Sequence, residues 1–148
     1  MAVKIKIAKE HESQLKDKDI KREVEEVQKF FNTANFEYSE GTINFVMLKG
    51  IYSHIKRSII IIGVYVNKTD SCVYGISSEL NLKFRNIDAQ IMTTNTNFPE
   101  EFIGKLDVDE GLLIHLDIPV IGLNKDAIFD ITDISGELNN VKLIKEKK

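Results

Sequence analysis

The hydrophobic pattern changes once along the chain, from helical to β spacing. A short alternating stretch at residues 3–7 predicts a strand. Between residues 17 and 36, apolar side chains then recur every three or four positions, which predicts an amphipathic helix with a charged opposite face. Asp17 and Asp19 lie where carboxylates help a helix to begin, and Gly41 ends the pattern. The apolar stripe consists of Ile20, Val24, Val27 and Phe31.

A run of β-branched residues at positions 58–66 is the clearest strand of the second part. Turn formers follow at 67–71, and a second strand-like stretch follows at 73–84, so we expect the two strands to form a hairpin. We also expect the first strand to be central, so that Asp in place of Ile60 or Ile62 would unfold the domain.

Further strands are predicted at residues 43–55, 89–96, 112–121, 124–134 and 138–144. Within 112–121 the even-numbered apolar residues share one face, while Leu113, His115 and Asp117 share the other. Many short strands separated by turns predict an immunoglobulin-like antiparallel β-sandwich with one N-terminal amphipathic helix. We expect residues 1–40 to form the strand and helix and residues 41–148 the sandwich, within a single compact domain.

Composition narrows the function. With 148 residues and a formal net charge of −3, the chain suits one domain and lacks the basic, aromatic-rich surface that binds nucleic acid. Its apolar runs are too short to insert into a membrane, and its N-terminal alternation is unlike the apolar core of a signal peptide. Cys72 is the sole cysteine, so no intrachain disulfide can form. The compartment, cytoplasm or envelope, stays open.

Few residues suggest chemistry. His115 and Asp117 would point to one side of a strand, and Asp107 and Asp109 lie in an acidic turn, so these four are the candidate metal ligands. Their ordinary interpretation is a solvated strand face and a polar turn, and we therefore expect no metal and no cofactor. Because the chain has neither a glycine-rich phosphate loop nor a Gly-x-Ser-x-Gly motif, we expect a protein that is not an enzyme.

A binding role has a candidate strand. The polar stretch Ala89, Gln90, Ile91, Met92 and Thr93 is typical of a sheet edge, which could accept a strand from a protein partner. The same edge, or the helix, could also join copies of the chain into a homo-oligomer.

Several short motifs resemble a known family. Residues 40–45 (EGTINF), 67–70 (NKTD), 102–106 (FIGKL) and 112–119 (LLIHLDIP) are similar to the SLAP-type domain of Firmicutes, which is associated with S-layer assembly and an accessory Sec pathway. The resemblance covers about residues 16–123. It implies a noncatalytic protein-interaction or assembly module of a Gram-positive bacterium, linked to the S-layer or to protein export. The alternative is a small cytoplasmic ligand- or metal-binding β-sandwich protein.

Overall fold

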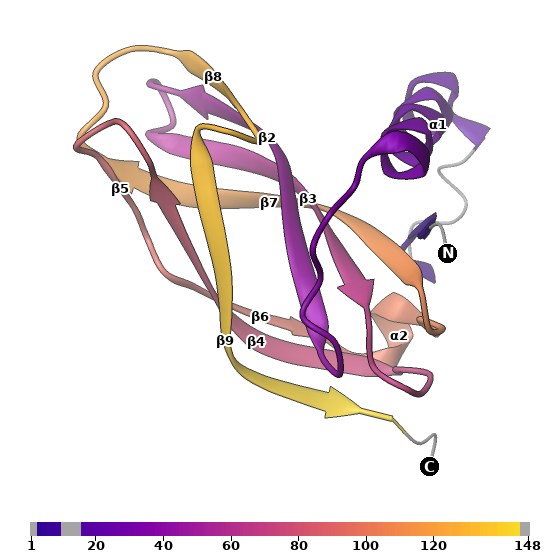
Figure 1. Cartoon of the computed structure of the whole chain (residues 1–148). Coiled ribbons are helices and arrows are strands. Elements are labelled where there is room, and N and C mark those ends of the chain that lie inside the picture. Colours follow the sequence, from indigo (N-terminus) through magenta and orange to yellow (C-terminus); the bar gives the residue numbers. More distant parts are fainter. Residues whose placement is uncertain (1–2, 10–15, 146–148) are drawn as a thin grey trace.

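The structure is a computed structural model that describes residues 3–9 and 16–145, and it is mainly β (Figure 1). Strand and helix predictions agree with it in most segments. The elements are β1 (Lys4–Ile7), α1 (Lys18–Thr33), β2 (Ile43–Ser53), β3 (Ser58–Asn67), β4 (Gly75–Phe84), β5 (Gln90–Ile91), β6 (Thr94–Phe98), α2 (Glu100–Ile103), β7 (Glu110–Ile121), β8 (Ala127–Asp130) and β9 (Ile134–Ile144).

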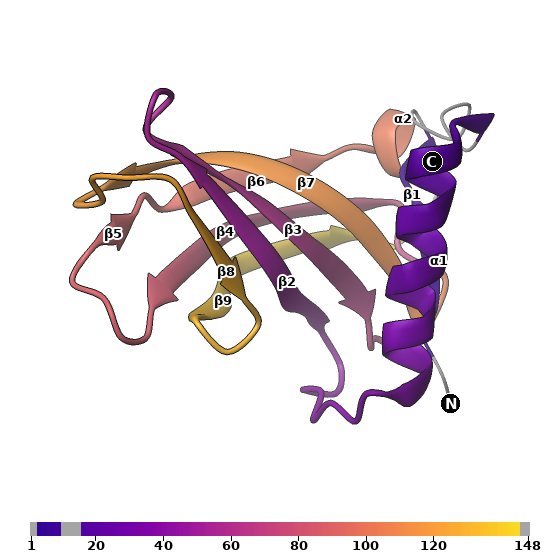
Figure 2. The ribbon, with the colours of Figure 1, turned by 90° about the horizontal axis from the view of Figure 1, so that it is seen from above.

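The strands form an open sheet that is antiparallel apart from β1, which runs parallel to β7. One half contains β7, β3, β2 and β8, and the other contains β9, β4 and β6. The two-residue strand β5 joins the halves, because it pairs with β4 on one side and β7 on the other. Figures 1 and 2 show the two halves facing each other, with α1 standing beside one end of β1 and β7.

The core lies between the two halves of the sheet. Ile59 and Ile61 of β3 are completely buried there, and they pack in one cluster with Leu80 of β4 and Ile118 of β7. The even-numbered apolar residues of β7 face this interior as the alternation predicts, whereas His115 and Asp117 are exposed on the outer face.

The parity of β3 corrects one expectation. Ile60 is 36% exposed and Ile62 is half-buried, because the odd-numbered residues of β3 face the core and these two face outward. A continuously apolar strand carries no alternation that would reveal which side is inside.

The expected hairpin between residues 58–66 and 73–84 is also wrong. β3 pairs with β2 and β7, while β4 pairs with β5, β6 and β9. The turn between them is fixed by Asn67, whose buried side chain donates to the carbonyls of Ser71 and Leu106 and accepts from the Thr69 N–H. These bonds direct the chain from one half of the sheet to the other.

Helix α1 confirms the predicted amphipathic helix. Asp17 caps it by accepting from the N–H groups of Asp19 and Ile20. Val27 and Phe31 are buried against the outer face of the sheet, in a cluster that also holds the apolar residues of β1. No helix in the described ranges is long and apolar enough to cross a membrane.

Candidate interaction site

The stretch expected to be a free edge is paired on both sides. Gln90 and Ile91 form β5 between β4 and β7, and the Met92 N–H donates to the carbonyl of Pro119. The edge assignment for Ala89–Thr93 is therefore corrected, because an edge strand has one unpaired side. Whether these residues contact a partner stays a prediction.

An unpaired edge does exist one strand away, on β7. β3 pairs with one edge of β7 along almost its whole length. On the other edge, β1 pairs with residues 110–113 and β5 with residues 120 and 121. Between them, no strand in the described ranges pairs with residues 114–118 on this side; we call this stretch the β7 gap.

Two hydrogen bonds show which backbone groups face the β7 gap. The Val120 N–H donates toward β3, to the Arg57 carbonyl, while the Pro119 carbonyl accepts from β5's side. Backbone groups of an antiparallel strand alternate between its two edges. The N–H and C=O of His115 and Asp117 therefore point into the gap, away from β3.

The free edge of β6 lies near the β7 gap, because Met92 just before β6 bonds to the Pro119 carbonyl and Phe98 at the end of β6 lines a cleft with residues 113–116 of β7. In the described part of the chain, β6 pairs with β4 alone. Arg85, which directly follows β4, donates its N–H toward β9, so the odd-numbered residues of β4 direct their backbone groups toward β9. Ser78 is even-numbered and therefore directs its groups toward β6, where it lies opposite Thr96. By the same alternation Asn95 and Asn97 direct their backbone groups away from β4, toward the gap.

A cleft of about 270 Å³ lies in the gap. Its floor is apolar, and its outer rim is formed by the first half of α1. It is enclosed by five elements, so it is recessed rather than a projecting edge. The residues that line it are Ile7 of β1, Ile20 and Glu23 of α1, Phe98 of β6, Phe102 of α2, and Leu113, Ile114, His115 and Leu116 of β7.

The sheet has a second interruption, between β2 and β9, and this one is blocked. Within the part of the chain that the structure describes, residues 43–47 of β2 pair with β3 alone, yet β2 lies against β9. The Phe45 ring fills the space between them: a Cβ on Gly63 would lie 2.4 Å from Phe45 Cζ, and one on Gly136 would lie 3.2 Å from Phe45 Cδ2.

His115 and Asp117, predicted as a metal pair, lie on the outer side of the β7 gap. His115 Nε2 is 2.8 Å from Glu23 Oε1, which ties β7 to α1. Asp117 is exposed and lies opposite Ile60 of β3. The structure thus brings His115 to a carboxylate on the helix that the sequence pattern did not indicate.

Asp107 and Asp109 both lie just before β7, and each forms an ion pair with a lysine. Asp109 Oδ1 is 2.8 Å from Lys68 Nζ, which also lies 4.7 Å from the centre of the Tyr38 ring. Asp109 has φ 65°, a left-handed conformation that Asp tolerates better than most residues. This ion pair fixes the turn that leads into β7.

Asp107 contacts the single cysteine. A hydrogen bond from the Cys72 thiol, followed by the nearby Lys105, holds the pKa of Asp107 below its ordinary value. Burial, followed by the hydrogen bond to Asp107, raises the pKa of Cys72. A raised pKa keeps the thiol protonated at neutral pH, which is the opposite of what a nucleophilic cysteine requires.

The four candidate ligands do not converge. Asp109 and Asp117 are eight residues apart along one extended segment, about 27 Å at the rise of a strand. Across residues 3–9 and 16–145, no group of three or more His, Cys, Asp and Glu side chains is placed to hold a metal ion.

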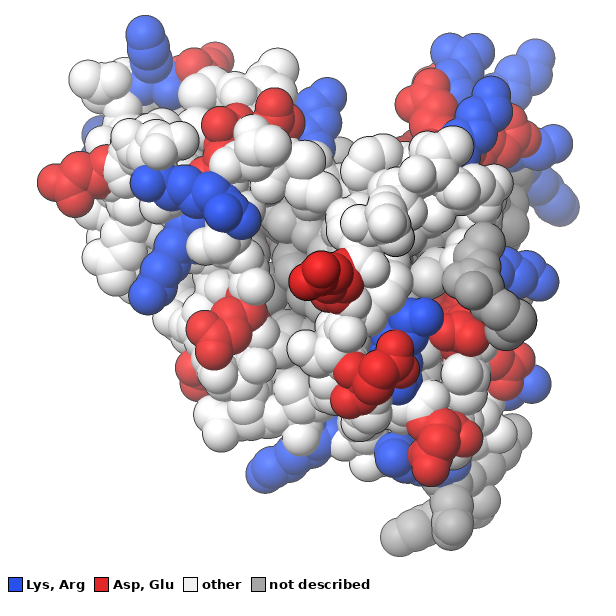
Figure 3. Space-filling model, viewed as in Figure 1, with Lys and Arg blue, Asp and Glu red and all other residues white. Residues whose placement is uncertain are grey.

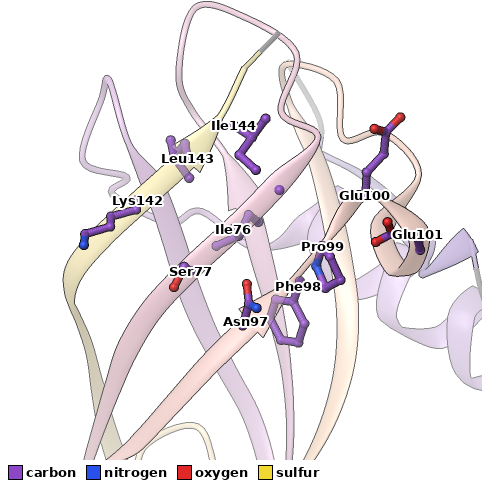
Figure 4. A pocket seen from close by; sticks show the side chains of 11 residues that line it. Ile76, Ser77, Asn97, Phe98, Pro99, Glu100, Glu101, Lys142, Leu143 and Ile144 are labelled. Atoms are coloured by element: carbon purple, nitrogen blue, oxygen red, sulfur yellow. The ribbon is translucent and has the colours of Figure 1, made fainter. Parts of the chain in front are cut away.

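A second pocket, of about 560 Å³, lies where β4, β6 and β9 end (Figure 4). Ser77, Asn97 and Lys142 come from three neighbouring strands, and Glu100 and Glu101 follow on α2. This depression is open and is lined by apolar side chains as well as polar ones, and it could hold a small molecule.

Charge on the visible face favours no polyanion. Figure 3 shows Lys and Arg side chains interspersed with Asp and Glu, over α1 as well as over the sheet. A surface that tracks phosphates would instead gather basic side chains along one stripe.

Comparisons with known proteins assign neither a family nor a function to the chain. Neither the family models, nor the curated proteins, nor the solved structures contain a match to this chain.

Proposed function

We propose that the chain is a noncatalytic protein-interaction module that receives an extended segment of another protein as an added strand in the β7 gap. The observation that carries this proposal is the interrupted pairing of β7 opposite the free edge of β6. His115 and Asp117 on one side, and Asn95 and Asn97 on the other, direct backbone donors and acceptors toward the same space.

A polypeptide strand is the ligand that matches such a space. Its N–H and C=O groups repeat at the spacing of the two flanking edges, and each added backbone bond contributes about 0.5–1.5 kcal/mol. Backbone N–H and C=O groups are strong donors and acceptors, so those that face no partner strand can bond to an added strand.

The partner is another protein rather than the sheet edge of a second copy. The cleft is recessed beneath α1, where residues 113–116 of β7 meet Phe98 at the end of β6, and we propose that a single extended chain enters there. Edge-to-edge pairing of two copies would need a projecting edge strand, and the β7 gap is not one.

Two more specific expectations, the immunoglobulin-like fold and the role in S-layer assembly or protein export, belong to this proposal. An open antiparallel sheet whose halves pack face to face supports an immunoglobulin-like sandwich. The resemblance to the SLAP-type domain supports a role in S-layer assembly or accessory protein export, where extended segments of exported chains are natural partners.

The alternative, a small-ligand protein, rests on the pocket in Figure 4. Its metal form predicts that added divalent cations raise the melting temperature by mass action. A flat response would count against the metal form, and it would leave the strand proposal unaffected.

Strand addition can be tested with a tethered peptide. In a Cys72→Ser background, Asn97→Cys places one thiol at the exposed rim of β6, and a short Thr/Val peptide is attached to it through a disulfide. Tethering gives a high effective concentration, so weak binding is detectable. The amides of His115 and Asp117 should exchange with solvent about tenfold more slowly.

The matched control is the same peptide N-methylated at the alternate positions that would bond β7. It keeps the side chains but loses the donors, and it should protect neither amide. Equal protection by both peptides, or protection by neither, would overturn the proposal.

A further inference from the structure

The cleft beneath α1 is apolar on the inside. Phe98 of β6 and Leu113 and Ile114 of β7 line it, and all three are buried. The ring of Phe98 is stacked on that of Phe102 in α2, with centres 5.4 Å apart and planes within 19° of each other. Water finds few hydrogen-bond partners between such walls, so an apolar cleft of this kind is a typical site for a small apolar ligand.

The volume of the cleft suits a molecule of one or two rings. An apolar cavity of about 150 Å³ is already large enough to bind benzene. The cleft measures about 270 Å³, which leaves room for a fused ring such as indole. It falls just below the range of roughly 300–1,000 Å³ that is usual for drug-sized ligands, so the occupant is small.

The rim of the cleft carries a carboxylate. Among the described residues that line the cleft, the ionisable ones are Glu23 of α1 and His115 of β7, and Glu23 Oε1 lies 2.8 Å from His115 Nε2. A carboxylate has two oxygens and accepts several hydrogen bonds, so Glu23 can also accept from a ligand. A cationic donor attached to the ring would therefore be stabilised at the rim, whereas a negative group would be repelled.

We infer that the cleft binds a small aromatic molecule that carries an amine, with the ring against the apolar floor and the amine at Glu23. Contact with the floor supplies most of the affinity, and Glu23 selects the head group. This site goes beyond the proposed strand addition, because it uses side chains where an added strand uses backbone groups. Either can therefore hold without the other.

The test compares two probes that differ in charge. Tryptamine and indole-3-propionate have the same ring and the same two-carbon chain, and they end in an amine and a carboxylate respectively. Each is titrated into isotope-labelled protein while the amide chemical shifts of residues 113–116 are followed. Tryptamine should give saturating shifts with a Kd of about 1 mM or below, as expected for a ligand of this size. Indole-3-propionate should bind about tenfold more weakly at low salt, and the difference should shrink at about 1 M salt.

Two pairs of variants locate the probe. Glu23→Gln should remove most of the preference for tryptamine, whereas Glu25→Gln, at an exposed acid on the same helix, should keep it. Ile20→Phe enlarges a side chain that lines the cleft and should weaken both probes about tenfold. Ile51→Phe, the same change at an exposed position of β2, should leave binding unchanged. Thermal melting followed by circular dichroism verifies that each variant is folded.

Three results would contradict the inference. Without saturating shifts at residues 113–116 for either probe, the cleft would not be a ligand site, and strand addition would stand or fall on its own test. Equal affinity for the two probes would remove Glu23 from the choice of head group. Binding that survives Ile20→Phe unchanged would place the probe outside the cleft.

Discussion

The outer face of the sheet has two ends that differ in one respect, the presence of α1. At one end Val46, Val64 and Leu113, from three neighbouring strands, are buried beneath Val27 and Phe31 of the helix. At the other end the same strands are bare. There, an isoleucine row consists of Ile128, Ile51 and Ile60, which lie opposite one another on β8, β2 and β3 and are 68%, 37% and 36% exposed.

The comparison shows that burial on this face is decided by where the helix lies rather than by strand composition. Both ends are β-branched and apolar, and a helix of 16 residues is about 24 Å long, too short to cover both. Substitutions at the covered end should therefore destabilise the protein strongly, whereas substitutions at the bare end should have small effects on stability.

The largest expected effect separates the two faces of β3. Ile61→Asp places an unpaired charge among completely buried side chains and should cost more than about 4 kcal/mol, enough to unfold the domain. Ile60→Asp, on the bare end of the outer face, should cost less than about 1 kcal/mol. Urea unfolding followed by circular dichroism measures both. If the two variants were equally unstable, the assigned parity of β3 would be wrong.

The fate of Ile60 illustrates what the sequence could and could not predict. Alternation in residues 112–121 correctly predicted which side of β7 faces the core, because polar residues mark the outer side. Residues 59–62 are all isoleucine, so no polar residue marks which side faces the core. The exposure of the two outward residues, Ile60 and Ile62, then depends on how far the distant helix α1 covers the outer face.

The second prediction concerns the helix side of the covered end. Phe31 is buried and its ring centre lies 5.3 Å from that of Phe36, so Phe31→Ala should lose about 3–5 kcal/mol. The adjacent Phe30 is 39% exposed, and Phe30→Ala is the matched control, with a loss of about 1 kcal/mol. A small loss for Phe31→Ala would indicate that α1 adds little to the stability of the sheet.

The third prediction concerns the sheet side of the covered end. A Cβ on Gly111 would lie 2.6 Å from Val64 Cγ1 and 3.0 Å from Val3 Cγ1, so Gly111→Ala should destabilise by about 1–3 kcal/mol. Adding Val64→Ala should recover part of this loss by removing the nearer methyl group. Additive losses in the double variant would show that the close approach is not the cause.

The candidate site was harder to predict from the sequence than the strands were. Residues 89–93 suggested an edge because they are polar, but an edge is defined by which strands pair, and that depends on contacts distant in the chain. Pro119, which lacks an N–H, is the local signal that could have pointed to a free edge on this strand. The pairing of His115 with Glu23 is separated by 92 residues and left no local trace.

The smallest expected effect lies at the boundary between the covered and bare ends, where His115 meets Glu23. Their side chains are 51% and 32% exposed, so solvent screens the interaction, and a double-mutant cycle should give a coupling of about 0.2–1 kcal/mol. The cycle uses Glu23→Gln, His115→Gln and the double variant, each unfolded in urea at low and high salt. A coupling well above 1 kcal/mol would mean that this contact holds the first half of α1 over the β7 gap. Substituting either residue should then also increase the protection that a tethered peptide gives to Asp117, because a loosened helix rim opens the cleft. A coupling within the expected range, with no change in peptide protection, would instead show that Val27 and Phe31 hold α1 on the sheet without help from this ion pair.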